Sequence, residues 1–452
     1  MKKKLLCTLL AVTLLLGLAA CGGGNADTPP NTDQPVTDLP NGEPADSSDS
    51  PSAEPVTLKM LDDGLGVWES AMDPIAERWN ELHPEAPITI EYCAYGTTDE
   101  IIEMNLGMGS TEYDIIAVDT PKVAEYSEKG YLKPLDDYVS DAELGKLQQT
   151  CLSSLTYKDQ LVVMPMQTGI TLLYYNKTLL DQADVTVREN GPDNRLTFEE
   201  IVDYCKQALA VLDPNGTEGI CGFTWGQVNK TYAMLQLPTC LGGIQIGDDT
   251  ATLEGVVDSK EWRDAYAFYQ SLYNDGVSTY GISSDDANSL FKSGKVLFLM
   301  NSYSRWKDYQ KNEDYEIVMC YDPMFAGHED TVCAPTGSWN VGVSAFSKNP
   351  EIAAEFVKFY TLGEGHDMWV ELNGAFSAVQ ADVDAIMADP DANYGTKIAF
   401  SEAAAIAKPR PVIPTFSAYE TVIDTLWADL ALGADPDTCI ENAINTYRSM
   451  IG

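Results

Sequence analysis

Residues 161–180 read LVVMPMQTGITLLYYNKTLL and carry the pattern that decides the fold. Pro165 interrupts the apolar run early, Gly169 adds backbone freedom, and ITLLYY is rich in residues that favour strands. The pattern predicts a strand, a kink and a second buried strand that ends at Asn176 and Lys177. Strands of two successive α/β units would be joined here by a segment that crosses between two lobes. A central strand of a single domain fits the same stretch equally well.

Strands and helices alternate along the first part of the fold. Residues 56–119 contain three strand-like stretches, VTLKML, ITIEYCAY and YDIIAVD, separated by the helical stretches WESAMDPIAERWNELH and IIEMNLGMG. A further helix, PKVAEYSEKG, is expected between Pro121 and Gly130. Beyond the crossing segment, Thr197 and Glu200 form a capping box before the helical IVDYCKQALAVL. This rhythm predicts an α/β fold with a mostly parallel sheet and helices on both faces.

Length and charge limit the expected partners and the number of lobes. The chain has 452 residues and a formal net charge of −41. Residues 56–452 keep −37 once the three lysines of residues 1–20 and the seven carboxylates of residues 22–55 are left out. Nucleic acid is not an expected partner, because phosphate contacts need a basic surface. A folded part of about 400 residues exceeds one compact core and indicates two lobes.

The N-terminus has the plan of an export signal. Residues 1–20 place three lysines before an apolar run that is too short for a permanent membrane span. LAAC, ending at Cys21, resembles the bacterial lipoprotein signal, in which the cysteine is lipidated and becomes the new N-terminus. An incidental cysteine after a conventional cleavage site is the alternative. Residues 22–55 hold no aromatic or basic residue and predict a disordered tether.

Six segments after the tether resemble, in the expected order, the extracellular solute-binding proteins of bacterial ABC importers, in particular the carbohydrate-binding family. They are DIIAVDTPKVAEYSEKGYLKPLDDYV, LVVMPMQTGITLLYYNKTLL, LTFEEIVDYCKQAL, ANSLFKSGKVLFLMNSYSRW, SWNVGVSAFSKNPEIAAEFVKFY and RPVIPTFSAYETVIDTLWADLALGADPDTCIENAIN. The similarity covers nearly everything after the tether. In NGAFSAVQ, Ser377 stands where that family usually has proline.

The resemblance implies a periplasmic-binding-protein-like clamshell. Each of its two α/β lobes would have a mostly parallel sheet flanked by helices, and crossing hinge segments would join the lobes. The first lobe is expected to contain residues 56–165 and about 320–373, and the second about 166–319 and 374–452. A ligand cleft lies between the lobes in that family and closes on binding.

Candidate ligand-binding residues follow from strand ends and from loop aromatics. Ligands of such sheets bind beyond the carboxyl ends of strands, and sugars need aromatic platforms with planar donors and acceptors. At strand ends we expect ligand contacts from Asp62, Asp63, Tyr95, Asp119 and Thr120. The kink and two later segments, which match cleft-lining segments of the family, add Gln167, Thr168, Asn301 and Arg410. Any of these polar residues could instead cap a helix or form a turn.

Tryptophans divide by context. Three tryptophans lie in turn-like surroundings with Gly or Ser nearby, which favours a role in ligand binding: Trp225, Trp306 and Trp339. Packing under a lobe is the alternative for each of them. Amphipathic helices place four others in the core: Trp79, Trp262, Trp369 and Trp427. Trp68 fits either role.

Cofactors and metals are not expected. The histidines, His83, His328 and His366, are scattered without zinc-ligand spacing. The sequence DPDANYG at residues 389–395 fits an acidic surface turn better than a calcium-binding loop. Eight cysteines remain after Cys7 and Cys21. No close Cys-x-x-Cys pair occurs among them, so most are expected to be buried free thiols, with one or two disulfides left open.

The sequence favours binding over catalysis. It contains no G-x-S-x-G, H-E-x-x-H or P-loop motif, and a glycosidase-like carboxylate pair is weak evidence in so acidic a chain. We expect a monomeric, lipid-anchored protein at the extracellular face of the cell membrane. It would capture a carbohydrate, an oligosaccharide, and deliver it to the permease subunits of an ABC transporter. A polyamine or another cationic solute is the alternative ligand, since carboxylates and tryptophan faces also bind amines.

Overall fold

Residues 161–180 contribute strands to two different sheets. In the computed structural model, β6 (Met164–Pro165) lies in a five-stranded sheet and β7 (Thr171–Asn176) in a four-stranded one. The predicted order of strand, kink and strand is therefore confirmed, and the segment crosses between sheets. The structure describes residues 56–64, 68–94, 96–337 and 339–452, which belong to one compact unit, Glu54–Gly452. The predicted signal sequence, Cys21, the tether and Tyr95 lie outside these residues.

The five-stranded sheet and the helices packed on it are called the first lobe. Its strand order is β2-β1-β3-β12-β6. The strands that the sequence pattern predicted, β1, β2 and β3, run parallel, whereas β12 is antiparallel to both β3 and β6. The sheet is thus mixed rather than mostly parallel, because β12 and β6 belong to segments that cross between the lobes and not to βαβ units. The further strands are β1 (Leu58–Gly64), β2 (Ile88–Ala94), β3 (Ile115–Asp119) and β12 (Trp339–Val343).

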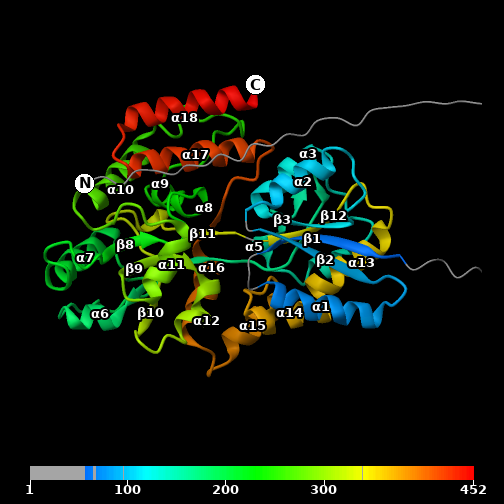
Figure 1. Cartoon of the computed structure of the whole chain (residues 1–452), viewed down its shortest axis with the longest axis horizontal. Coiled ribbons are helices and arrows are strands. Elements are labelled where there is room, and N and C mark those ends of the chain that lie inside the picture. The colour runs from blue at the N-terminus through cyan, green and yellow to red at the C-terminus, as the bar shows by residue number, and fades with distance from the viewer. Residues whose placement is uncertain (1–55, 65–67, 95, 338) are drawn as a thin grey trace, which may run out of the picture. The chain divides into compact units, whose positions relative to one another are not determined.

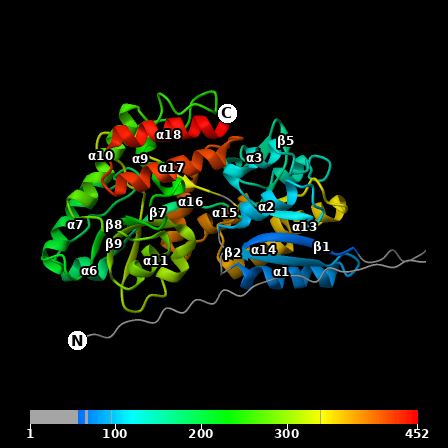
Figure 2. The same ribbon diagram turned by 45° about the horizontal axis from the view of Figure 1, so that its top comes forward.

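Helices cover this sheet through regularly spaced apolar residues. In α1 (Glu69–Leu82), the residues Met72, Ile75 and Trp79 recur three to four positions apart and are all buried. In Figures 1 and 2, α1 lies on one side of β1 and β2, and α2 and α3 lie on the other. The remaining helices of the lobe are α2 (Thr98–Leu106), α3 (Val123–Glu128), α4 (Asp141–Leu144), α5 (Gln149–Leu152), α13 (Pro350–Leu362) and α14 (Glu364–Asn373), with the 3₁₀ turn η1 (Thr120–Lys122) and the small hairpin β4 (Thr156–Tyr157) and β5 (Gln160–Leu161).

The second lobe contains the four-stranded sheet, in the order β10-β7-β9-β8. Along β7, Leu172 and Tyr174 belong to one buried cluster and Leu173 to another. Alternate residues of a strand point to opposite faces, so the sheet is covered on both sides, as the apolar run ITLLYY requires. Only β8 and β9 pair in parallel here. The other strands are β8 (Cys221–Trp225), β9 (Val296–Ser302) and β10 (Ile317–Cys320).

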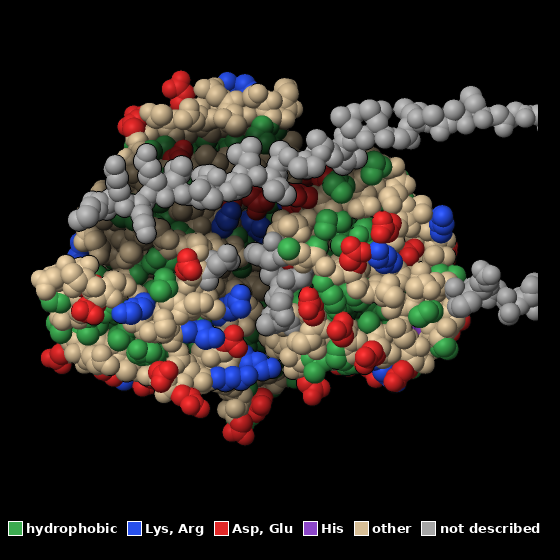
Figure 3. Space-filling model, viewed as in Figure 1, with side chains coloured by type: hydrophobic (Ala, Val, Ile, Leu, Met, Phe, Trp, Pro, Cys, Tyr) green, Lys and Arg blue, Asp and Glu red, His purple; other side chains and the backbone are tan. Residues whose placement is uncertain are grey.

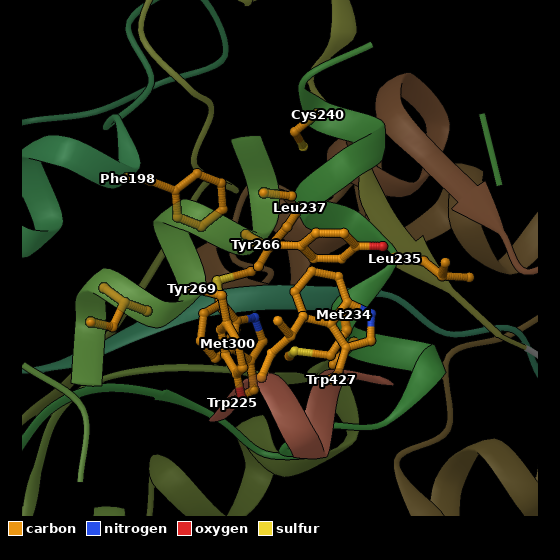
Figure 4. Packing of buried hydrophobic residues seen from close by; sticks show 14 of the residues in the cluster. Phe198, Trp225, Met234, Leu235, Leu237, Cys240, Tyr266, Tyr269, Met300 and Trp427 are labelled. Atoms are coloured by element: carbon orange, nitrogen blue, oxygen red, sulfur yellow. The ribbon is translucent and has the colours of Figure 1, made fainter. Parts of the chain in front are cut away.

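One face of this sheet carries a core rich in aromatic residues, which Figure 4 shows from close by. Trp225, Tyr266, Tyr269 and Trp427 meet there, with the Trp225 and Tyr269 ring centroids 5.6 Å apart. Figure 1 shows α17 and α18, in orange and red, beside α9 and α10. Helices of this lobe are α6 (Lys177–Gln182), α7 (Phe198–Leu212), α8 (Thr231–Met234), α9 (Gln236–Cys240), α10 (Lys260–Asn274), α11 (Ser284–Lys292), α12 (Trp306–Tyr309), α15 (Gln380–Ala388), α16 (Tyr394–Ile406), α17 (Phe416–Ala431) and α18 (Pro436–Ile451), with 3₁₀ turns η2 (Tyr303–Arg305) and η3 (Glu329–Thr331).

Several local predictions are confirmed. Thr197 and Glu200 form the capping box that starts α7. The four tryptophans expected in the core, Trp79, Trp262, Trp369 and Trp427, are fully buried. Within the described part of the chain, no helix is both long enough and apolar enough to cross a lipid bilayer.

Three stretches connect the lobes and lie against one another. The backbone N–H of Thr168 donates to the carbonyl of Phe376 over 2.9 Å. The hydroxyl of Thr336, in β11 (Ala334–Thr336), donates to the carbonyl of Gly169. A Cβ on Gly169 would lie only 3.0 Å from the Gly337 carbonyl oxygen, so this contact favours glycine. Since β11 pairs with β13 (Ala407–Pro409), it still belongs to the second lobe.

The return to the first sheet comes later than expected. The predicted boundary lay near residue 320, but Cys320 ends β10 in the second-lobe sheet. The next strand of the first-lobe sheet is β12, which begins at Trp339. A short antiparallel strand such as β10 can pair at the sheet edge without a helical crossover, and nothing in its sequence distinguishes it from a first-lobe strand.

Candidate functional site

Buried carboxylates stand at the carboxyl end of β1. Asp63 accepts a hydrogen bond of 2.7 Å from the hydroxyl of Thr98, at the start of α2. Asp62 accepts one of 2.9 Å from the backbone N–H of Asp63, and it is fully buried. Burial raises the pKa of Asp62 to about 8, although the Asp63 backbone N–H opposes the shift. Burial also raises the pKa of Asp63, against the Thr98 hydrogen bond. The charges of Asp99 in α2 and Asp119 at the end of β3 raise the pKa of Asp63 further.

An ion pair joins the two lobes at the end of β3. The Nη2 atom of Arg410, which follows β13, donates to Oδ1 of Asp119 over 2.7 Å. The guanidinium also lies over the rings of Tyr232 and Phe416, at 5.1 and 5.8 Å from their centroids. Among the described residues, none accepts a hydrogen bond from Arg410 Nε, although that atom is buried. The site therefore holds an oriented, nearly buried guanidinium whose Nε has no acceptor among the described residues.

Further polar contacts extend this connection. The Lys122 ammonium donates to the Ser417 hydroxyl over 2.8 Å, and the backbone N–H of Ser417 donates to Glu125 over 2.9 Å. Glu420 lies 3.7 Å from Lys122 and 3.8 Å from Arg410. Burial raises the pKa of Glu420, although both cations oppose the shift. We call this set the polar bridge; its members are Asp119, Lys122 and Glu125 of the first lobe and Arg410, Ser417 and Glu420 of the second.

Trp339 stands next to the polar bridge. It is paired with Asp119 in the register between β12 and β3, so both side chains leave the sheet on the same side. Its ring makes an edge contact with Trp68, with 5.5 Å between centroids, and Trp68 makes a similar contact with Trp369. Trp68 itself is buried, whereas Trp339 is partly exposed. Trp339 is thus the aromatic ring that the described strand ends present for stacking.

The crossing residues are close to this group. Gln167 accepts a hydrogen bond of 3.2 Å from the indole N–H of Trp369. Thr120 is buried, and its hydroxyl lies 3.1 Å from the Asn340 amide nitrogen. Thr168 is held by its backbone contact with Phe376. Gln167 therefore supports the cluster of Trp68, Trp339 and Trp369. Thr120 and Thr168 hold the neighbouring strand end and crossing segment in place.

Three expected site residues lie elsewhere. Trp225 is not in a loop: it ends β8, is 1% exposed and packs in the second-lobe core shown in Figure 4. Trp306 begins α12, where its indole N–H donates to Asn393 over 2.9 Å and its ring packs on Tyr174. Asn301 is buried in β9 and donates to the Tyr309 hydroxyl over 2.8 Å. The Gly and Ser neighbours that suggested exposed loops instead relieve crowding, since a Cβ on Gly226 would collide with Asn301.

Ser377 occupies the third crossing stretch. Its hydroxyl donates to Asp382 in α15, and it lies 2.9 Å from His366 Nε2 in α14. His366 Nε2 also lies 3.2 Å from Asp382. This is not the arrangement of a hydrolase triad, because both partners contact the same ring nitrogen. The serine that replaces the family's usual proline thus links helices of the two lobes.

Sequence reasoning missed five members of the site: Lys122, Glu125, Tyr232, Ser417 and Glu420. Lys122 directly follows the predicted strand end, and Ser417 and Glu420 are one helical turn apart just after Arg410. These positions could have been found from their neighbours. Tyr232 lies in the short helix α8 with no local signal, and only the fold brings it against Arg410.

Metal binding finds no support in the described part of the chain, where no three His, Cys, Asp or Glu residues are arranged to hold an ion. DPDANYG instead ends α15 at Asp389 and caps α16 through Asn393, as expected for a turn. All eight cysteines of this part are free, and seven are buried, as predicted for most of them. Figure 3 shows basic and acidic side chains at the back of a hollow near the centre of one face.

Comparisons with known proteins agree with this architecture. A putative binding protein of Brucella abortus is 27% identical over 41% of the chain and 43% of its own length, so the match spans less than half of that relative. The galactooligosaccharide-binding protein of Bacillus subtilis is 22% identical over 100% of the chain and 98% of its own length. A maltose-bound protein of T. maritima superposes with a TM-score of 0.73 at 21% identity, covering 87% of this chain and 100% of that one.

These matches fix the fold as the two-lobed clamshell. The family model for bacterial extracellular solute-binding protein matches residues 75–394, which span β2, β3, the crossing segments and most of the second lobe. The chain therefore belongs to the bacterial extracellular solute-binding protein family.

Proposed function

We propose that this protein captures a carbohydrate, an oligosaccharide, between its lobes and delivers it to the permease of an ABC transporter. Membership in a solute-binding family makes it a binding protein and not an enzyme. The sugar as ligand is supported by the relatives, among which are a galactooligosaccharide-binding protein and a mannitol-binding protein.

One observation carries the proposal. Trp339 and Asp119 are register neighbours at the first-lobe strand ends, and Arg410 reaches Asp119 from the second lobe. An aromatic face stacks on a pyranose ring, and a carboxylate and a guanidinium serve hydroxyl groups as acceptor and donor. A solute held by this group contacts both lobes at once, so its binding favours one lobe arrangement.

The test is calorimetric titration of the purified protein with neutral gluco- and galacto-oligosaccharides and with polyamines, at low and high salt. Binding of a neutral sugar should be nearly indifferent to salt. Trp339→Ala should weaken sugar binding about 10- to 100-fold, because it removes a stacking contact and the apolar surface that this contact buries. Tyr280→Ala is the control, because Tyr280 is 52% exposed and packs on Tyr273 in the second lobe, away from the polar bridge.

A cationic solute is the competing ligand. Carboxylates outnumber cations around the polar bridge. The charges of Asp99 and Asp119 raise the pKa of Asp63, and the charge of Asp119 raises the pKa of Glu420. Heat with polyamines alone, fading steeply as salt rises, would keep the fold and replace the ligand class. Binding of neither class would contradict the proposed function.

Anchoring completes the proposal. Cys21, outside the described residues, would carry the lipid that holds the protein at the extracellular face of the membrane, and residues 22–55 would be its tether. Replacing Cys21 by Ser should release the protein into the medium, as followed by cell fractionation. A monomer is expected and should be seen by light scattering.

A further inference from the structure

Two cysteine sulfurs meet inside the second lobe. Sγ of Cys240 and Sγ of Cys333 are 3.5 Å apart, which is van der Waals contact. Cys240 is the last residue of α9, as Figure 4 shows at the edge of the aromatic core, and Cys333 immediately precedes β11. Both residues are buried. The two cysteines are 93 positions apart in the sequence, and the chain between them includes α10, α11, β9, α12 and β10.

The backbones around the two thiols are already held together. The Thr331 hydroxyl donates to the Cys240 carbonyl over 2.7 Å, and the Gln236 side-chain amide donates to the Cys333 carbonyl over 2.9 Å. A disulfide has an S–S length of about 2.05 Å, so closing it requires an approach of about 1.5 Å. Rotation of the two side chains can supply that approach while the hydrogen-bonded backbones stay in place.

The remaining thiols offer no comparable pair. Cys93 contacts the Thr98 hydroxyl and the Asp62 carbonyl, and Cys221 contacts the carbonyls of Phe223 and Val277. Among the cysteines that the structure describes, the one sulfur-to-sulfur contact joins Cys240 and Cys333.

We propose that Cys240 and Cys333 are a disulfide site, closed when the chain folds outside the cytoplasm. The setting follows from the extracellular family, since disulfides form and persist in oxidising surroundings. The oxidant is a low-molecular-weight disulfide. One cysteine thiolate attacks it, forms a mixed disulfide and releases one thiol. The second cysteine then attacks the protein sulfur of that mixed disulfide and releases a second thiol, so two protein thiols are oxidised and one disulfide is reduced.

The disulfide forms while the chain folds and not after folding is complete. The hydrogen bond to Cys240 and burial together raise the pKa of Cys333 well above its usual value, so the buried Cys333 thiol is a poor nucleophile once the lobe has folded. During folding both thiols are accessible to the oxidant.

The bond would fix one end of a crossing segment. Cys333 leads through β11 to Gly337, where a Cβ would meet the ring of Tyr232, and β11 pairs with β13 just before Arg410. Cys333, Tyr232, Gln236 and Arg410 also line one small cavity. The disulfide therefore ties α9 to the strand that positions the second-lobe side of the polar bridge.

Peptide mapping tests the site directly. The full chain is unfolded and refolded with oxidised glutathione. Its free thiols, including buried ones, are then blocked by alkylation in denaturant, and the digest is analysed by mass spectrometry without reduction. The expected product is a linked peptide pair containing Cys240 and Cys333, with Cys205 and Cys221 alkylated. Reduction should lower the melting temperature of the refolded protein by a few degrees, through restored freedom of the unfolded chain.

Matched variants separate this bond from other effects. Cys240→Ser should leave Cys333 alkylated and make the melting temperature insensitive to reductant, whereas Cys205→Ser, a buried cysteine in α7, should keep the linked pair. Alkylation of both Cys240 and Cys333 in the refolded wild type would overturn the proposal, and so would a bond from either one to another cysteine.

Discussion

The candidate ligand-binding residues lie in different surroundings in the two lobes. In the first lobe, the expected residues Asp63, Asp119 and Trp339 meet at the ends of neighbouring strands. In the second lobe, the expected Trp225 and Trp306 are buried. Asp63 and Asp119 were expected from their positions at strand ends, whereas Trp225, Trp306 and Trp339 were all expected from their Gly and Ser neighbours.

Position at a strand end does not separate the site residues from the buried tryptophans, because Trp225 also ends a strand, β8, and is only 1% exposed. Small neighbours do not separate them either: Gly226 relieves crowding beside the buried Asn301, whereas Gly337 precedes the partly exposed Trp339 in the sequence. The packing of the whole lobe decides which aromatic rings are covered.

The largest expected effect distinguishes the two kinds of tryptophan. Trp225→Ala should lower the free energy of unfolding by about 3 to 5 kcal/mol, because it empties a fully buried site in the aromatic core. Trp339→Ala should cost less, about 1 to 2 kcal/mol, because its ring is partly exposed and packs at the edge of the first-lobe core, beside Trp68. Urea unfolding followed by circular dichroism measures both.

Trp225→Phe is the control for volume and should recover most of the loss. Equal destabilisation by the two alanine variants would remove the distinction between the lobes. A loss of ligand affinity in Trp225→Phe at unchanged stability would return Trp225 to the site.

Much of the fold could be predicted from short stretches. The crossing at residues 161–180, the capping box at Thr197 and the βαβ order of the first lobe depend on local patterns, and all three occur. The late return to the first sheet could not be predicted in this way. The edge strand β10 and the crossing strand β11 are short, and their lobe is decided by pairing with β7 and β13, far away in the sequence.

The same limit applies to the site. Asp119 and Arg410 were expected separately, as a strand end and as part of a family segment, but their contact spans 291 positions and depends on how the lobes meet. Tyr232, in the short helix α8, has no local signal that points to its contact with Arg410. Chain-distant contacts of this kind follow from tertiary packing, which a single sequence does not display.

A smaller effect is expected at the first-lobe strand end, as a function of pH. Burial raises the pKa of Asp62 from its usual 3.8 to about 8, so between these values the folded chain binds more protons than the unfolded chain. The free energy of unfolding should therefore decrease as pH rises, by up to about 1.4 kcal/mol per unit from this group, or about 3 kcal/mol between pH 5 and 7.

Asp62→Asn should remove this slope and make the protein more stable than wild type at pH 8. Asp203→Asn, at an exposed position of α7, should leave the slope unchanged. Urea midpoints across the pH range give the answer. The same slope in wild type and Asp62→Asn would show that Asp62 titrates normally, and the first-lobe carboxylates would then resemble solvent-exposed ones.

The smallest effect concerns the junction between the lobes. Ser377→Ala removes a hydroxyl that donates to Asp382 and accepts from the backbone N–H of Val379 over 3.0 Å. The expected loss is about 1 to 2 kcal/mol, because Asp382 keeps only His366 as the partner shown in this cluster. Ser293→Ala should change stability by less, since that exposed hydroxyl donates only to the Leu290 carbonyl.

This pair of variants also bears on the comparison of the lobes. His366 belongs to α14 of the first lobe, whereas α15, which carries Asp382, packs its Val383 and Ile386 against a second-lobe cluster. Ser377 thus connects the lobes at a position where proline cannot hydrogen-bond through its side chain. If Ser377→Pro is as stable as wild type while Ser377→Ala is weakened, backbone restriction replaces the lost hydrogen bonds, and the serine and proline forms of the crossing are equivalent solutions. If both variants are weakened alike, the hydroxyl is a specific connection between the lobes of this chain.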